Sequence, residues 1–239
     1  MQLNYRWIVW AHLSSCLLLL SACEAQNSGI QVEHTSAASG HEYTILKWNS
    51  GSPDWTTERP SAEDETVLLC VAAAFTQQEE NSIDGLWSDN GSMRDKPRVN
   101  RNIGGGCLIK DGELLLLNTK GEVSLDSAFT AGLQRDVDFF QQILCVIDGQ
   151  AEKFRDTKMF QRRAICTMND GSEAVIETVK SATLAQFSVD LVELGVNRAL
   201  YTDMGGWDEG WYRYGDGVIP IGRMKTATGR QTNWFVIKQ

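Results

Sequence analysis

The residues best suited to chemistry lie in the last third of the chain, around Asp203. This aspartate comes directly after residues 196–202, whose apolar and β-prone side chains predict a strand, and Gly205 and Gly206 follow it. Open sheets tend to place ligands just beyond the carboxyl ends of their strands, and glycine lets a ligand approach the backbone closely. Asp203 is therefore a candidate catalytic carboxylate. The alternative is that it only caps the turn that it begins.

Two adjacent arginines, Arg162 and Arg163, stand at the start of a second predicted strand, residues 163–168. A guanidinium offers a planar fork of donors that fits phosphate or carboxylate oxygens. An arginine beside Asp203 would hold a phosphate while the carboxylate acts on the neighbouring atom. The alternative is that one arginine is solvated and the other is held in a structural ion pair.

An aromatic, glycine-rich stretch follows Asp203 at residues 207–217. Flat rings stack on the apolar faces of sugars, and nearby carboxylates accept hydrogen bonds from sugar hydroxyls. Aromatic rings also contribute strongly to core packing, so the same rings can simply close the edge of the core. Together with the glycines and the second arginine, the predicted substrate-binding residues are Arg163, Gly205, Gly206, Trp207, Asp208, Trp211 and Tyr212.

The acidic residues of this region do not predict a metal site. Asp203, Asp208, Glu209 and Asp216 could gather around a divalent cation such as calcium, but their spacing matches no standard calcium loop. The four cysteines of the body of the chain show no metal-ligand spacing either. We therefore expect no metal and no other cofactor.

The elements that must position these side chains are predicted by local patterns. Residues 163–168 and 173–179 predict a hairpin around an Asn-Asp-Gly turn. A helix follows, capped by Ser181 or Thr183, with an apolar face over residues 184–194 and a stop at Gly195. Strands are expected at 196–202 and 233–237.

Further strands are expected earlier in the chain. Residues 66–75 form a continuous apolar run typical of a buried central strand. Residues 107–117 predict a hairpin around Asp111-Gly112, and residues 129–144 are compatible with either a helix or a strand. Strands outnumber helices, so the expected fold class is α+β, a mixed β-sheet core packed with a few helices.

The order of these motifs resembles the phosphodiester glycosidase domain family, the family of N-acetylglucosamine-1-phosphodiester alpha-N-acetylglucosaminidase and of bacterial exopolysaccharide-associated proteins. The resemblance is carried by Arg-Arg-Ala-Ile at 162–165, the hairpin, the helix, and Tyr-Thr-Asp-Met-Gly-Gly at 201–206. It implies that Arg162 matches the family arginine and Asp203 the family aspartate, and that both are catalytic. It also implies hydrolysis of a sugar linked through a phosphodiester at its anomeric carbon.

The sequence departs from the family pattern at three places. Where the family carries Asn-Gly-Gly-Phe-Phe, residues 72–76 read Ala-Ala-Ala-Phe-Thr, so the asparagine is missing. Met204 replaces the first glycine after the aspartate, and Trp207 stands beside the position of the family serine. These changes predict either an altered substrate or lost activity.

The N-terminus resembles the signal of a bacterial lipoprotein. Arg6 precedes an apolar stretch that ends in Leu-Ser-Ala before Cys23, which resembles a lipobox. This predicts a signal peptide over residues 1–22, lipid on Cys23, a flexible tether over 23–41 and one glycosidase-like domain over 42–239. The expected location is the bacterial cell envelope, on the outer membrane or the periplasmic face.

Charge and cysteine content narrow the choice of partners. The net charge is -9, which argues against nucleic acid. The expected partners are a carbohydrate or glycoconjugate and, through the lipid, a membrane. Cys70, Cys107, Cys145 and Cys166 lie in apolar segments. They are either buried free thiols or members of one or two disulfides.

Two functions therefore compete. The first is a cell-envelope glycosidase that hydrolyses a sugar-1-phosphodiester bond. The second is a non-catalytic, glycan-binding surface lipoprotein with a degenerate glycosidase site. A purely structural envelope protein ranks behind both, because the aromatic loop after Asp203 suits a ligand.

Overall fold

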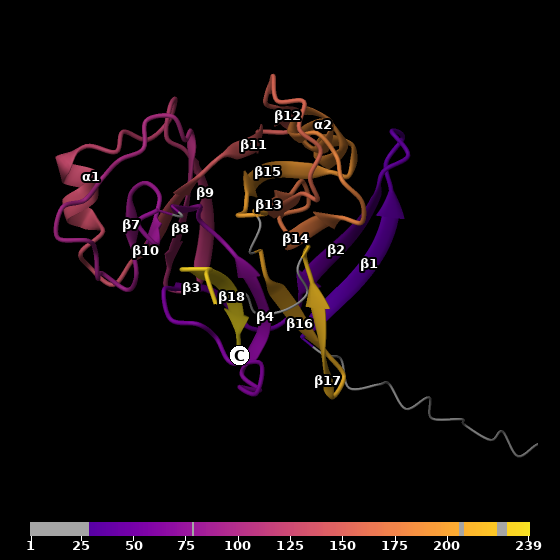
Figure 1. Ribbon diagram of the computed structural model, residues 1–239, viewed down its shortest axis with the longest axis horizontal. Coiled ribbons are helices and arrows are strands. Elements are labelled where there is room, and N and C mark those ends of the chain that lie inside the picture. The colour runs from indigo at the N-terminus through magenta and orange to yellow at the C-terminus, as the bar shows by residue number, and fades with distance from the viewer. Residues whose placement is uncertain (1–28, 78, 206–207, 224–228) are drawn as a thin grey trace, which may run out of the picture.

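The computed structural model describes residues 29–77, 79–205, 208–223 and 229–239, and this part of the chain is mostly β-sheet (Figure 1). Its two helices are short, α1 with six residues and α2 with ten. The expectation of a β core was correct, but the α+β class was too rich in helix. The reason is that residues 129–144, which were compatible with either a helix or a strand, contribute only the end of a six-residue helix and otherwise form turns and strand residues.

The largest sheet has seven strands in the order β1-β2-β14-β13-β15-β11-β12, and every neighbouring pair is antiparallel. Its strands are β1 Ile30–Ser36, β2 Glu42–Trp48, β11 Leu144–Ile147, β12 Gln150–Ala151, β13 Arg163–Met168, β14 Glu173–Thr178 and β15 Val196–Tyr201. The predicted 163–179 hairpin and the 196–202 strand are thus confirmed and lie side by side.

Strand β1 corrects the predicted tether. Residues 30–36 were expected to be flexible, yet they pair along their whole length with β2. They form an edge strand with a largely exposed outer face, so their sequence lacks the apolar run of a central strand. Residue Cys23 and the predicted signal peptide lie outside the described residues.

A five-stranded sheet has the order β17-β16-β4-β18-β3 and carries the central apolar strand that the sequence predicts. Its strands are β3 Ser52–Thr56, β4 Val67–Ala72, β16 Gly210–Tyr214, β17 Gly217–Ile221 and β18 Trp234–Lys238. All six residues of β4 are buried, because its neighbours β16 and β18 cover both edges and its two faces pack on apolar clusters.

Smaller sheets complete the β structure. A four-stranded sheet has the order β7-β10-β8-β9, and a two-stranded ribbon pairs β5 with β6. These strands are β5 Thr76–Gln77, β6 Ser82–Ile83, β7 Trp87–Ser88, β8 Gly105–Lys110, β9 Glu113–Asn118 and β10 Asp138–Gln142. The β8–β9 hairpin turns at Asp111 and Gly112, both with positive φ, as predicted. The ambiguous 129–144 segment contains the end of α1 (Ser127–Gly132) and all of β10.

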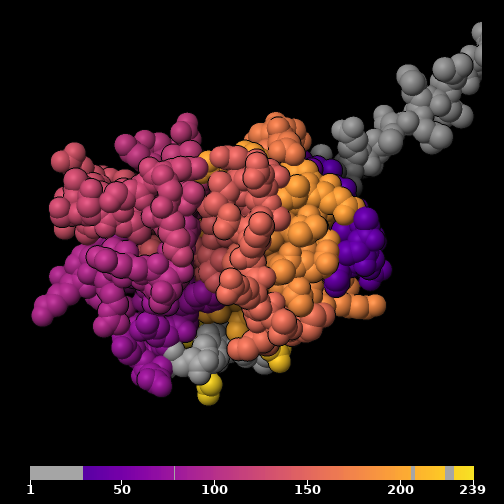
Figure 2. All heavy atoms as spheres, turned by 90° about the horizontal axis from the view of Figure 1, so that it is seen from above, coloured from indigo at the N-terminus to yellow at the C-terminus, as the bar shows by residue number. Residues whose placement is uncertain are grey.

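The main core lies where the three larger sheets face one another. Leu46 and Ile165 of the seven-stranded sheet, Phe235 of the five-stranded sheet and Phe140 of the four-stranded sheet all belong to it. On the surface, the magenta segments lie at one end of the molecule and the orange and indigo segments at the other (Figure 2). The core joins segments far apart in the chain, which fixes the strand ends that carry the candidate site.

Helix α2 (Leu184–Glu193) covers the other face of the seven-stranded sheet. The side chain of Thr183 caps it by accepting from the backbone N–H of Gln186, and Gly195 follows with φ +83°. Both boundaries agree with the predicted cap and stop. In the described part of the chain, no helix is long and apolar enough to cross a membrane.

Candidate functional site

Asp203 lies just past the end of β15 and is almost completely buried. Its Oδ2 accepts a hydrogen bond of 3.0 Å from the backbone N–H of Thr76, and its Oδ1 accepts one of 3.1 Å from Gly205. Its own backbone N–H donates to the carbonyl of Ala73. The carboxylate is thus held in one orientation by the distant segment 73–76 and by the turn that follows Asp203 itself.

Burial sets the acidity of Asp203. Desolvation raises the pKa of this carboxyl to about 6, because the charged form loses its hydration. The two backbone N–H groups lower the pKa, nearby Asp208 raises it and Arg163 lowers it, so the net shift remains upward. A carboxyl that titrates near neutral pH is suited to proton transfer.

Arg163 is fully buried between two carboxylates. Its Nη1 donates to Oδ1 of Asp208 at 2.7 Å, and its Nε donates to Oε2 of Glu177 at 2.7 Å. Burial alone would lower the pKa of Arg163, but the charges of Asp208 and Glu177 outweigh it and the net pKa is raised. The register explains the pair with Glu177, since Arg163 and Glu177 stand opposite each other on β13 and β14.

The turn after β17 closes this ion-pair cluster. The backbone N–H of Gly222 donates to Oε1 of Glu177 at 3.1 Å, and that of Arg223 donates to Oδ2 of Asp208 at 2.9 Å. A Cβ at position 222 would lie 2.2 Å from Oδ2 of Asp208. Only glycine therefore fits at this point of closest approach, where φ is +82°.

Arg162 points to the opposite face of β13 and binds the protein itself. Its Nε donates to the carbonyl of Ala182 and its Nη1 to the hydroxyl of Tyr201. Its Nη2 donates to the carbonyl of Lys158 and approaches Asp156 at 3.4 Å. The guanidinium of Arg162, which was expected to hold a phosphate, instead binds the loop before β13 and the segment that leads into α2.

Asn233 was not predicted as a site residue, yet its side chain supports the segment of the site that contains Thr76. The Oδ1 atom of Asn233 accepts from the backbone N–H of Ala74 at 2.7 Å, and its Nδ2 donates to the carbonyl of Ala74 at 3.1 Å. The same Oδ1 accepts from Nε1 of Trp55, and Gln142 donates to the carbonyl of Ala73. A side-chain amide therefore does bind the 72–76 segment, but it comes from the start of β18.

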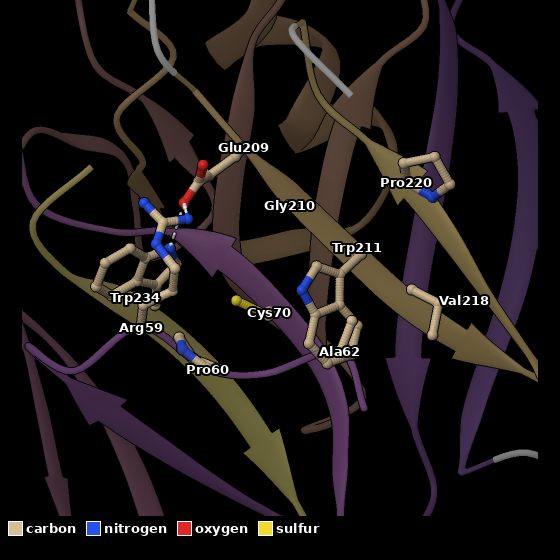
Figure 3. Close-up of a pocket in the computed structure, with 10 residues that line it drawn as sticks. All are labelled: Arg59, Pro60, Ala62, Cys70, Glu209, Gly210, Trp211, Val218, Pro220 and Trp234. Atoms are coloured by element: carbon tan, nitrogen blue, oxygen red, sulfur yellow. Dashed lines mark hydrogen bonds and ion pairs between the residues drawn. The ribbon is translucent and has the colours of Figure 1, made fainter. Parts of the chain in front are cut away.

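The predicted aromatic residues separate onto the two faces of β16. Tyr212 packs into the main core, whereas Trp211 lies on the outer face of the five-stranded sheet. There Trp211 and Trp234 line a cleft of about 260 Å³ (Figure 3). Successive residues of a strand face opposite ways, so these two predicted binding residues cannot share one pocket. Gly206 and Trp207 lie outside the described residues.

One end of this outer cleft is polar. Arg59 forms an ion pair with Glu209 and lies 4.8 Å from the ring centroid of Trp234 (Figure 3). The indole N–H of Trp234 donates to Glu209 at 3.1 Å. Asp208 and Glu209 therefore point into different environments, the first to buried Arg163 and the second to this cleft.

The acidic side chains do not converge on one point. Asp203 faces Thr76, Asp208 faces Arg163, and Glu209 faces Arg59. Across the described ranges, no group of three or more His, Cys, Asp or Glu side chains could hold a metal ion. The calcium alternative has no donor set within these residues.

The four cysteines of the body are buried free thiols. Desolvation raises the pKa of Cys145 to about 12, and burial also raises the pKa of Cys70, Cys107 and Cys166. Of the two alternatives that the sequence left open, the structure has the unbridged one.

Two findings place the fold among known structures. The chain is similar to the catalytic domain of zebrafish N-acetylglucosamine-1-phosphodiester alpha-N-acetylglucosaminidase, auto-inhibited by its pro-peptide, with a TM-score of 0.58 and 14% identity over 92% of this chain and 85% of that one. It is also similar to a hypothetical protein from Synechocystis, with a TM-score of 0.54 and 13% identity over 88% of this chain and 62% of that one.

These similarities establish a distant relationship of fold to a glycosidase catalytic domain. No family model matches the sequence, and no curated protein matches it. At 13% and 14% identity the similarity extends to the backbone arrangement and no further.

Proposed function

We propose that this protein is a glycosidase that hydrolyses the bond between a sugar and a phosphodiester at the anomeric carbon. One observation carries the proposal: a buried carboxylate, Asp203, lies at a strand end with a raised pKa and a fixed orientation. The glycosidase-like fold supports the same reading.

The reaction places modest demands on such a site. Water adds to the anomeric carbon as the bond from that carbon to the phosphate oxygen breaks, and the products are a free sugar and a phosphate monoester. The second pKa of a phosphate monoester is about 6, so the leaving group needs little protonation. Ionised Asp203 acts as base, nucleophile or stabiliser of the cationic transition state.

In this proposal the arginines position the site. Arg163 holds Asp208 and Glu177 in the ion-pair cluster next to Asp203, and Arg162 anchors the chain before β13. The proposal keeps the envelope location, with lipid on Cys23 holding the domain at a membrane, and the substrate is then a glycan or glycoconjugate of that compartment.

The test is sugar release. The purified full-length protein is incubated with a panel of sugar-1-phosphodiesters beside Asp203→Asn and a control, Asp111→Asn. Asp111 lies in an exposed turn where asparagine also tolerates positive φ. We expect turnover by the parent and by Asp111→Asn, and a loss of about 10²-fold or more in a folded Asp203→Asn protein.

The second candidate is a binder without turnover, favoured by the outer cleft beside Trp211 (Figure 3). The indole ring of Trp211 would stack on a sugar, and the Arg59–Glu209 pair would hold the sugar by hydrogen bonds. This candidate predicts that Trp211→Ala abolishes glycan binding while Asp203→Asn leaves it unchanged. If the parent releases no sugar from any member of the panel, the binding candidate replaces the enzyme.

A further inference from the structure

A second cleft, of about 450 Å³, opens beside the ion-pair cluster, and three exposed apolar side chains line part of it. Met159 is 54% exposed, Val179 49% and Phe160 37%, and all three side chains line it. Scattered surface apolar residues are ordinary, but a contiguous group that rims a concavity marks a binding surface.

The same cleft carries positive charge. Lys180 and Arg223 line it, and both are exposed. Within the described part of the chain, neither side chain forms an ion pair. An apolar rim next to two cations is complementary to an anion that carries a hydrocarbon group.

Hydrogen bonds connect this cleft to the ion-pair cluster. Gln161 lines the cleft and donates its side-chain N–H to Oε1 of Glu177 at 2.8 Å. The backbone N–H of Arg223 donates to Asp208, whose charge in turn raises the pKa of Asp203. Gln161 and Arg223 thus connect the cleft to the ion-pair cluster whose charges act on the candidate carboxylate, and none of the residues that line it lines the cleft beside Trp211.

We infer that this cleft holds the alcohol side of the substrate, and that this alcohol is a long-chain aliphatic one esterified to the phosphate. The inference rests on the proposed function, because it assigns the two halves of a sugar-1-phosphodiester. The phosphate lies near Lys180 and Arg223, and the chain packs on Met159, Phe160 and Val179. The sugar then faces Asp203.

Chain length gives a measurable signature. Each methylene that leaves water contributes about fourfold to affinity at the usual transfer energy per methylene. Octyl phosphate should therefore bind at least tenfold more tightly than methyl phosphate, even where only part of the chain is buried. Both probes are phosphate monoesters, so charge alone cannot produce the difference.

The binding experiment is calorimetric titration of the purified full-length chain with methyl phosphate and octyl phosphate. Val179→Thr and Met159→Gln keep size but add polarity, and each should reduce the octyl preference about threefold to tenfold. The matched controls are Val189→Thr and Leu115→Gln, which alter equally exposed apolar residues elsewhere. Lys180→Gln should weaken both phosphates alike.

A second measurement separates this inference from the proposed function. Turnover is compared on sugar-1-phosphodiesters with methyl and octyl alcohols. Chain-dependent binding without turnover would support the cleft and refute the hydrolase. Turnover with no chain preference would refute the cleft assignment and leave the hydrolase standing. Binding to anionic vesicles with no preference for octyl phosphate would also overturn the assignment, in favour of a membrane-docking face.

Discussion

The backbone N–H of Thr76 donates a hydrogen bond of 3.0 Å to Oδ2 of Asp203, although 127 residues separate them in the chain. Thr76 follows the central strand β4, and Asp203 follows β15 in a different sheet. The site therefore lies where the ends of two sheets meet. The orientation of the carboxylate depends on the packing of both sheets.

The pH dependence of activity should report Asp203. Its pKa is raised to about 6, and the proposed roles all need the ionised form. We expect kcat/KM to rise about tenfold per pH unit below 6 and to level off above it. A pH–rate profile on one sugar-1-phosphodiester measures this. A profile that stays flat between pH 4 and pH 7 would contradict the assignment of Asp203.

The ionisation of Asp203 should also make the folded protein less stable as the pH rises. Because the folded pKa exceeds the ordinary value of 3.8, the native state retains this proton longer than the unfolded chain does. The contribution is fully present below pH 3.8 and is lost as the pH rises through 6. Asp203→Asn should reduce the fall in unfolding free energy over this range, measured by urea titrations at several pH values.

Replacing Arg163 should destabilise the fold strongly. Arg163→Met leaves Asp208 and Glu177 buried without their partner, which costs about 3–5 kcal/mol for a buried pair. Urea unfolding measures the loss. The triple variant Arg163→Met with Asp208→Asn and Glu177→Gln removes the unpaired charges and should recover part of it. No recovery would mean that shape, not charge, sets the cost.

Gly222 and Gly149 form a matched pair that tests whether the close packing around position 222 requires glycine. Both have positive φ, but a Cβ at 222 would meet Asp208 and Arg163, whereas nothing lies within 4 Å of a Cβ at 149. Gly149→Ala should cost about 1 kcal/mol from backbone strain alone. Gly222→Ala should cost clearly more and reduce turnover as well, as thermal unfolding and kinetics would show. Equal costs would refute the steric argument.

Asn233 should support the site from β18. Asn233→Ala leaves the backbone N–H and carbonyl of Ala74 and the indole N–H of Trp55 without this partner. Buried groups left unsatisfied cost about 1–3 kcal/mol each, so the three together should cost at least about 3 kcal/mol in chemical unfolding. Asn169→Ala, in an exposed turn, is the control and should lie within about 0.5 kcal/mol of the parent.

Cys70, Cys107, Cys145 and Cys166 should behave as protected thiols. Their burial and raised pKa values predict negligible reaction with a thiol reagent in the native protein and full reaction after denaturation. A reductant should leave the midpoint of thermal unfolding unchanged. A lower midpoint on reduction would indicate a disulfide among them.

The sequence by itself determined the elements whose signals are local. The 163–179 hairpin has two short apolar runs around an Asn-Asp-Gly turn, and α2 has an apolar face between Thr183 and Gly195. These patterns depend on neighbours within a few residues, so they can be recognised without the fold. The strand end at Asp203 was predicted on the same basis.

Tertiary structure alone decided the partners of those elements. Strand β1 has no local signal because an edge strand buries only part of one face, and its pairing with β2 is what orders it. Successive strand residues face opposite ways, but only the packing of the sheets decides that Arg163 enters the ion-pair cluster and that Tyr212 enters the main core. The hydrogen bond between Asn233 and Ala74 joins residues 159 positions apart, and the one between Thr76 and Asp203 joins residues 127 positions apart. Such contacts arise from the packing of whole sheets, and no local pattern of side chains encodes them.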